Sequence, residues 1–380
     1  MAAERPGNLA PPPRVNPLLL GHERADAEVR RWIEEGCLGH ALLICGPWGI
    51  GKATWAFRIA RNILRRGETA QPGLLPALFA APEAAGDDAD EPLDETFRWV
   101  ASSAHPDLLT VERRFDEKRS RMVSEIVVDD IRRIGTFLAS SPARGGWRVV
   151  IVDAADEMNR NAANALLKVL EEPGGRSLLL LLAHQPGLLP ATIRSRCRRV
   201  LLRPLEEPTL VSLIDRYLPG TGAGDAAALG ALAEGSIGRA LQLAANDGLR
   251  VHHAFRAAFE AWASGARQPL LGLAADPAMS ADEDGFRVTA HILSWWLRRI
   301  ARVRVANAAE EGAAADILAA SGDVGAIRRI ALAAPLDRWQ QVWDKTQRLA
   351  VQAVAGNLDR RQTMTTILLE MQRELRPARS

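Results

Sequence analysis

The stretch from Cys45 to Thr54, CGPWGIGKAT, follows the apolar run HALLICG and leads into the helix-like segment KATWAFRIARNILRR. A strand, a glycine-rich turn and a helix in this order are the setting of a phosphate-binding loop of the G-x-x-x-x-G-K-[ST] type. Backbone amides and a lysine ammonium at a helix N-terminus attract phosphate. We therefore predict Gly46, Gly49, Gly51 and Lys52 as nucleotide-binding residues. The alternative is that the glycines only make the turn between strand and helix.

The loop lacks a group that hydrolysis needs. The position after the lysine normally carries a hydroxyl that holds Mg²⁺, and here it is Ala53. The apolar run RVVIVDAADEM ends in acidic residues, and Asp153 at the end of the predicted strand is a candidate metal ligand. ATPases with this motif carry a glutamate at the next position to polarise the attacking water, and here that position is Ala154. Thr54 is a further candidate, although one helical position turns a side chain by about 100°. We expect a degenerate nucleotide site that holds ATP or ADP without hydrolysis, and no intrinsic ATPase activity.

Further apolar runs repeat the order of strand and helix. HPDLLTVER, WRVVIVDAADEMN and SLLLLLA read as strands, and IVVDDIRRIGTFLASSPA and NAANALLKVLEEP read as helices between them. Continuous apolar strands separated by helices predict a parallel sheet with helices on both faces. After about Arg203 the pattern becomes helical throughout, so the predicted class is α/β followed by all-α.

Composition divides the chain into regions. We predict a flexible N-terminus at 1–16, an α/β domain at 17–203, a small helical domain at 204–248 and a larger helical domain at 249–380. Within the α/β domain, the stretch 67–95 is rich in Ala, Pro, Gly and acidic residues, which predicts a flexible insertion.

Charge and cysteine content exclude several classes of protein. The chain has 380 residues with 48 Lys and Arg against 46 Asp and Glu, so a net charge of +2 does not mark a nucleic-acid binder by itself. Cys37, Cys45 and Cys197 are too few and too far apart for a disulfide framework or a four-thiolate zinc site. No stretch is long enough to span a bilayer, and the Pro-rich start is unlike a signal peptide. We expect a soluble, cytoplasmic protein with no membrane partner.

The stretch TIRSRCRR places Arg196 just before a predicted strand. An arginine held there can enter the site of a neighbouring subunit and stabilise the charge on a transferring phosphoryl group. From the spacing alone, a surface arginine is the simpler interpretation, because Arg194, Arg198 and Arg199 lie beside it.

Together, GPWGIGKAT, HPDLLTVE, WRVVIVDAADEMN, NAANALLKVLEEP and TIRSRC resemble the clamp-loader branch of the AAA+ ATPases. The motifs span about residues 16–245, and the helical C-terminus fits only in length and composition. The resemblance implies a RecA-like AAA+ domain, a helical lid domain and a helical collar for oligomerisation. It also implies that the chain's own site is defective and that Arg196 is an arginine finger acting in trans.

The resemblance further implies the partners and the role. These are a tau/gamma-type ATPase subunit, a delta subunit, the sliding clamp and, through the complex, primed DNA during replication. Many relatives carry a zinc module where 67–95 has no cysteine, so we expect no zinc and no other bound metal. Active relatives carry a γ-phosphate-sensing arginine where this chain has Gly238, with Arg239 one position later, and a small polar sensor where it has His184.

Two other functions remain open at this level. An autonomous ATPase would need Thr54, together with Asp156 or Glu157, to replace the missing groups through a local shift. A free-standing DNA-binding protein would use the segment Trp296–Arg299 with nearby arginines, although arginines at helical spacing more often form a solvated helix face.

Overall fold

The computed structural model describes residues 9–35, 37–66, 94–116, 121–123, 125–144, 146–266, 270–274, 283–309, 324–332, 334–355 and 358–374. The predicted insertion at 67–95 therefore lies, up to residue 93, outside the described residues. The chain divides into two compact units, Met1–Thr209 with Ser236–Gly238 and Leu210–Gly235 with Arg239–Ser380. The four sequence-based domain boundaries stay a prediction.

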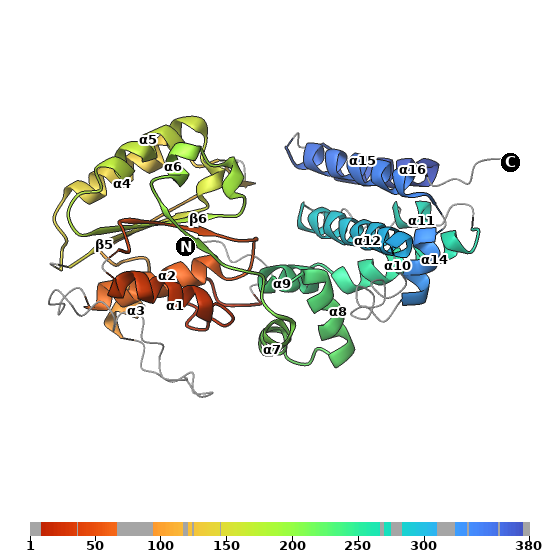
Figure 1. The fold of residues 1–380 in the computed structure, drawn as a ribbon, viewed down its shortest axis with the longest axis horizontal. Helices are drawn as coiled ribbons and strands as arrows, with labels where there is room; N and C mark the ends of the chain where they lie inside the picture. The colour runs from red at the N-terminus through yellow and green to blue at the C-terminus, as the bar shows by residue number, and fades with distance from the viewer. Residues whose placement is uncertain are drawn as a thin grey trace. The chain divides into compact units, whose positions relative to one another are not determined.

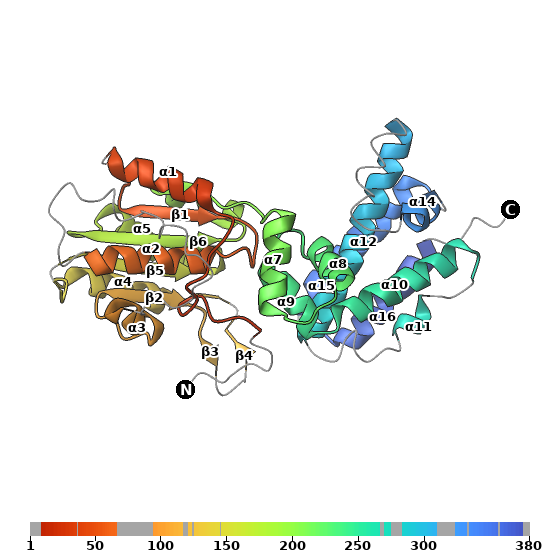
Figure 2. The ribbon, with the colours of Figure 1, turned by 90° about the horizontal axis from the view of Figure 1, so that it is seen from below.

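The first unit is built on a five-stranded sheet in the order β2-β5-β6-β1-β7, and every pairing in it is parallel. Figure 2 shows β1, β6, β5 and β2 side by side. The strands are β1 Ala41–Cys45, β2 Leu108–Glu112, β5 Arg148–Asp153, β6 Ser177–Ala183 and β7 Arg198–Leu201. A two-stranded antiparallel pair, β3 (Phe115–Asp116) with β4 (Arg121–Met122), lies apart from this sheet. The predicted parallel α/β sheet is confirmed.

Helices cover both faces of the sheet, as the apolar strands require (Figure 1). One face carries α1 Glu23–Glu34, α2 Lys52–Arg66 and α3 Glu95–Ala101, and the other carries α4 Val128–Ala139, α5 Arg160–Glu171 and α6 Ala191–Arg194. Successive side chains of β1 divide between the two cores, with Leu42 and Ile44 on the α2 side and Leu43 and Cys45 on the α5 side. All seven residues of the central strand β6 are buried.

The strand register fixes which loops share an edge of the sheet. Cys45 is level with Ala183 and Leu201, and Asp153 is level with Glu112. Because the strands are parallel, the turns after β1, β5 and β6 all leave from the carboxyl edge.

The second unit is entirely helical in the described residues. Its helices are α7 Glu207–Tyr217, α8 Ala223–Ala233, α9 Ile237–Ala245, α10 Gly248–Ala263, α11 Leu271–Ala274, α12 Glu283–Ala309, α14 Val324–Leu332, α15 Leu336–Ala355 and α16 Arg360–Glu374. Trp295, Trp296 and Trp339 are almost completely buried, so they fill a core and offer no stacking surface for bases. Across the described parts of the chain, no helix combines the length and the apolar character that crossing a bilayer takes.

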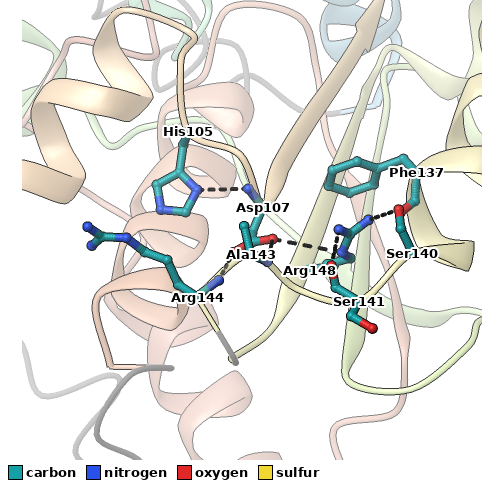
Figure 3. Close-up of polar contacts among 8 residues, drawn as sticks. All are labelled: His105, Asp107, Phe137, Ser140, Ser141, Ala143, Arg144 and Arg148. Carbon is teal, nitrogen blue, oxygen red and sulfur yellow. Dashed lines mark hydrogen bonds and ion pairs between the residues drawn. The ribbon is translucent and has the colours of Figure 1, made fainter.

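A buried charge cluster holds the opposite, amino edge of the sheet (Figure 3). Asp107, just before β2, accepts hydrogen bonds from the amides of Ala143 (2.8 Å) and Arg144 (3.1 Å), and its own amide donates to His105 Nδ1 (3.1 Å). The Arg148 guanidinium at the start of β5 lies 3.8 Å from the same carboxylate. The two side chains are only 2% and 9% exposed.

The remaining contacts of Arg148 complete this cluster. Its Nη1 donates to Ser140 Oγ (3.0 Å), its Nη2 donates to the Ser141 carbonyl (2.5 Å), and its guanidinium carbon lies 4.6 Å from the centre of the Phe137 ring (Figure 3). The HPD segment of the HPDLLTVE motif therefore has a structural role, because it ties the start of β2 to the loop between α4 and β5.

Replacing Asp107 by alanine should destabilise the protein by about 3 kcal/mol. The change leaves two amides without their acceptor and the buried Arg148 without its counter-charge. Urea unfolding followed by circular dichroism measures the free energy of unfolding. Asp129→Ala is the matched control, because the exposed Asp129–Arg132 pair on α4 is worth less than about 1 kcal/mol. An equal loss in both variants would show that the Asp107 cluster adds nothing beyond a surface pair.

Candidate functional site

The predicted phosphate loop joins β1 to α2 at the carboxyl edge of the sheet. Gly46, Gly49 and Gly51 have positive φ angles of 156°, 77° and 102°, which glycine adopts without strain. A Cβ at position 46 would lie 2.5 Å from the Leu202 carbonyl oxygen, so a side chain does not fit there. The loop has the local geometry that the motif predicts.

Five consecutive carbonyls of this loop accept hydrogen bonds. Lys52 Nζ donates to the carbonyls of Gly46 (2.8 Å) and Pro47 (2.6 Å). The next three carbonyls, those of Trp48, Gly49 and Ile50, accept from Ser236 Oγ (2.8 Å), the Gly238 amide (2.9 Å) and His22 Nε2 (2.7 Å). Ser236 and Gly238 belong to the same compact unit as the loop. The loop is therefore held on its carbonyl side by segments distant in sequence.

Lys52 and Asp153 belong to one site. Lys52 is 4% exposed, and burial lowers the pKa of its ammonium to about 8, an effect that Asp153 and Asp156 oppose. Burial raises the pKa of Asp153 to about 6, helped by Glu112 and opposed by Lys52. A lysine and a strand-end carboxylate therefore lie close enough at one edge of the sheet to influence each other's pKa, and their role in binding phosphate and metal stays a prediction.

Positions 53 and 154 carry alanine where an ATPase of this kind carries a hydroxyl and a glutamate. Ala53 lies in the first turn of α2 and Ala154 is 2% exposed directly after β5. Thr54 is 8% exposed and lies one helical position beyond Ala53, about 100° around the axis. Among the predicted nucleotide residues, Gly46, Gly49, Gly51 and Lys52 lie in one loop, Asp153 influences the pKa of Lys52, and Thr54 lies in the first turn of α2.

The two carboxylates that an autonomous ATPase would need are already engaged. Asp156 accepts hydrogen bonds from the amides of His184 (3.0 Å) and Gln185 (2.6 Å), so it holds the turn after β6. Glu157 pairs with Arg113 at 2.6 Å. Sequence reasoning missed these partners because both are distant along the chain.

His184 follows the end of β6 and lies near Lys52 and Asp156. Burial, with a contribution from Lys52, lowers the pKa of its imidazole to about 4. The ring is therefore neutral at pH 7 and does not supply positive charge to the site.

Gly238 packs directly on the phosphate loop. A Cβ at this position would lie 2.8 Å from Gly49 Cα, which is closer than real side chains approach. An arginine at position 238 is therefore incompatible with this packing. The neighbouring Arg239 lies 3.9 Å from Glu234, and burial lowers its pKa.

Arg196 lies at the amino edge of the sheet, opposite the carboxyl edge from which the phosphate loop leaves. It precedes β7, whose first residue, Arg198, pairs with Leu42 near the start of β1. The phosphate loop follows the end of β1, a strand of five residues or about 16 Å. Arg196 Nη2 pairs with Glu171 Oε1 (2.7 Å), and Nη1 donates to the Thr192 carbonyl (3.1 Å). The guanidinium is thus fixed, partly exposed, and remote from the loop of its own chain.

The described site is a glycine-containing turn between a strand and a helix of a parallel sheet, with an acidic residue at the tip of a neighbouring strand. The family model described as "DNA polymerase III, delta subunit" matches residues 77–206. The DNA polymerase III subunit delta' of Pseudomonas aeruginosa is 38% identical over 158 residues, which cover 42% of this chain and 41% of the relative. The resemblance to the clamp-loader subunits of DNA polymerase III is confirmed.

Two further comparisons are with a tau subunit and with a gamma subunit-related protein. The DNA polymerase III subunit tau of Salmonella typhimurium is 30% identical over 188 residues, which cover 50% of this chain and 25% of the relative. A solved DNA polymerase III gamma subunit-related protein from Thermotoga maritima is 19% identical, with a TM-score of 0.38, over 93% of this chain and 100% of that chain. The chain spans less than half the length of the two curated relatives.

Gly238→Ala should cost about 1 to 3 kcal/mol of folding free energy, because the added methyl group overpacks the contact with Gly49. Thermal and urea unfolding measure the change. Gly230→Ala is the control, since a Cβ there meets only Leu210 and Val211 side chains at 3.9 and 4.0 Å, and alanine favours a helix. If Gly238→Ala were as stable as Gly230→Ala, position 238 would have room for a side chain.

His184 should make the protein less stable as pH falls. Its pKa is about 4 in the folded protein against 6.5 for an unperturbed histidine, so between these values only the unfolded chain binds the proton. The contribution is complete above pH 6.5 and is lost as pH falls towards 4. His184→Gln should reduce the drop in unfolding free energy between pH 7 and pH 5 by about 1 kcal/mol. An unchanged drop would show that His184 titrates normally.

Proposed function

We propose that the chain acts as a non-hydrolysing subunit of the DNA polymerase III clamp loader, in the manner of a delta-prime subunit. In this role it supplies Arg196 to the nucleotide site of a neighbouring ATPase subunit and helps to load the sliding clamp on primed DNA. The observation that carries the proposal is the separation of Arg196 from the chain's own phosphate loop by the length of the sheet. A guanidinium fixed at that edge serves a site on another chain.

The missing hydrolytic groups support this role. Ala53 offers no oxygen to Mg²⁺, Ala154 offers no base to water, and Asp156 and Glu157 are engaged elsewhere. The protein has no ATPase activity of its own in this proposal and contributes to the DNA-directed DNA polymerase as part of a complex. The same engaged carboxylates count against an autonomous ATPase.

The cofactor in this proposal is ATP or ADP, held without hydrolysis and without zinc. The amide side of the loop and the Lys52 ammonium are the groups that would meet phosphate. To do so, Lys52 would leave the carbonyls of Gly46 and Pro47, to which it now donates. We therefore expect nucleotide affinity to be weak.

The partners in this proposal are a tau/gamma-type ATPase subunit, a delta subunit, the sliding clamp and, through the complex, primed DNA, in the cytoplasm. Two of the relatives named above are a delta' and a tau subunit of DNA polymerase III, and the resemblance to clamp loaders suggests the rest of this set. An oligomer is also what the role of Arg196 requires, because that arginine needs a second chain on which to act.

Arg196→Ala should silence one ATPase site in a loader reconstituted from the native partner subunits, clamp and primed DNA. A finger of this kind contributes roughly 10³-fold or more to the rate of the site that it completes. The measurement is steady-state ATP hydrolysis per assembled complex, with assembly checked by gel filtration. Arg133→Ala, an exposed arginine on α4, is the control. If Arg196→Ala assembles and hydrolyses ATP at the native rate, Arg196 is only a structural residue.

The isolated chain separates this proposal from an autonomous ATPase. The proposal predicts no turnover in either the native chain or Lys52→Ala. Turnover that disappears with Lys52→Ala would establish the autonomous enzyme instead.

A further inference from the structure

A cavity of about 530 Å³ lies between α6, the turn before it and the edge strand β7. Its apolar lining comes from Leu43, Pro186 and Ala191, and its polar lining from Arg194, Ser195 and Arg199. This volume lies within the usual range for binding sites. None of the lining residues is acidic, so Arg194 and Arg199 line the cavity without a carboxylate among its walls.

The four arginines from Arg194 to Arg199 divide into two pairs. Arg196 is neutralised by Glu171, and Arg198 stacks 4.0 Å from the Trp32 ring centre while donating to the Cys37 carbonyl. Both of these have partners within the fold. In the part of the chain that the structure describes, no ion pair is formed by Arg194 or Arg199, and Arg199 contacts the Cys45 thiol. The second pair is therefore exposed and has no carboxylate partner among the described residues.

The surroundings of the cavity are apolar and exposed. Leu201 lies two residues after Arg199 on the same face of β7 and is 52% exposed. Leu188 follows the lining residue Gly187 and is 67% exposed. A cationic cavity beside two exposed leucines matches an acidic side chain flanked by apolar ones on another protein better than it matches a small hydrophilic anion.

The geometry points to a docking site for an acidic segment of the neighbouring ATPase subunit, with an Asp or Glu side chain held between Arg194 and Arg199. The inference rests on the proposed function, because that function places the adjoining Arg196 at the same interface. Guanidinium groups bind carboxylates through two parallel hydrogen bonds, which fixes orientation as well as affinity. The cavity would thus set the position from which Arg196 reaches across to the neighbouring site.

The test measures binding separately from catalysis. The probe is the purified tau/gamma-type ATPase subunit from the same cell, titrated into the full-length chain by calorimetry at two salt concentrations. Arg194→Gln combined with Arg199→Gln should raise the Kd roughly tenfold or more and flatten its salt dependence. Arg31→Gln combined with Arg133→Gln removes the same charge from exposed positions on α1 and α4 and should leave the Kd unchanged.

The outcomes distinguish this inference from the proposed function. If Arg196→Ala silences a site while the Arg194/Arg199 variant binds the probe normally, the proposed function holds and the docking inference is overturned. If the Arg194/Arg199 variant alone loses binding, the docking site stands whatever Arg196 does to the ATPase rate.

A second titration, with inorganic phosphate, tests whether the cavity binds a small anion instead. Phosphate binding that needs both arginines, together with unchanged binding of the ATPase subunit, would make the cavity a small-anion site and overturn the inference.

Discussion

The phosphate loop packs against its neighbours so closely that two of its contacts leave no room for a Cβ atom. One contact is between Gly46 and the Leu202 carbonyl, and the other is between Gly238 and Gly49. Overpacking of this kind displaces backbone on both sides of the contact. The path of the chain from β1 into α2, its exit after β7 and the placement of residues 236–238 all depend on these glycines. The same constraint excludes a nucleotide-sensing arginine at position 238.

Because all strands of the sheet run in parallel, the two sets of predicted site residues lie at opposite edges of the sheet. Parallel strands put Lys52 and Asp153 at the carboxyl edge, and the segment before β7 puts Arg196 at the amino edge. A bond from Arg196 to Glu171, at the end of α5, holds it there. The loop at one edge and Arg196 at the other are therefore held by separate contacts of this fold, and the alanines at positions 53 and 154 leave the contacts of Arg196 unchanged.

The sheet was predictable because strands buried on both faces are apolar throughout, as β6 and β5 are, and because a helix follows the loop at Lys52. The contacts that determine the geometry of the site were not predictable from the sequence. Asp107 meets amides 36 and 37 residues away, Asp156 meets His184 and Gln185, and Gly238 meets Gly49. No local pattern encodes such pairs, since the same acids and glycines also suit exposed turns. A sequence therefore shows which groups are missing, and only the fold shows that the nearby acids are engaged elsewhere.

The loop has a structural role in the fold that does not depend on nucleotide. Its carbonyls from Gly46 to Ile50 accept hydrogen bonds from Lys52, Ser236, Gly238 and His22, and each such bond contributes about 1 kcal/mol net. Phosphate would be met by the loop amides, which are different groups from the carbonyls, and by Lys52 only after it leaves the carbonyls of Gly46 and Pro47. Ala53 and Ala154 remove chemistry from the phosphate side alone. The glycines and the lysine therefore contribute to the fold whether or not the loop binds nucleotide, so a complete loop is not by itself a sign of catalysis.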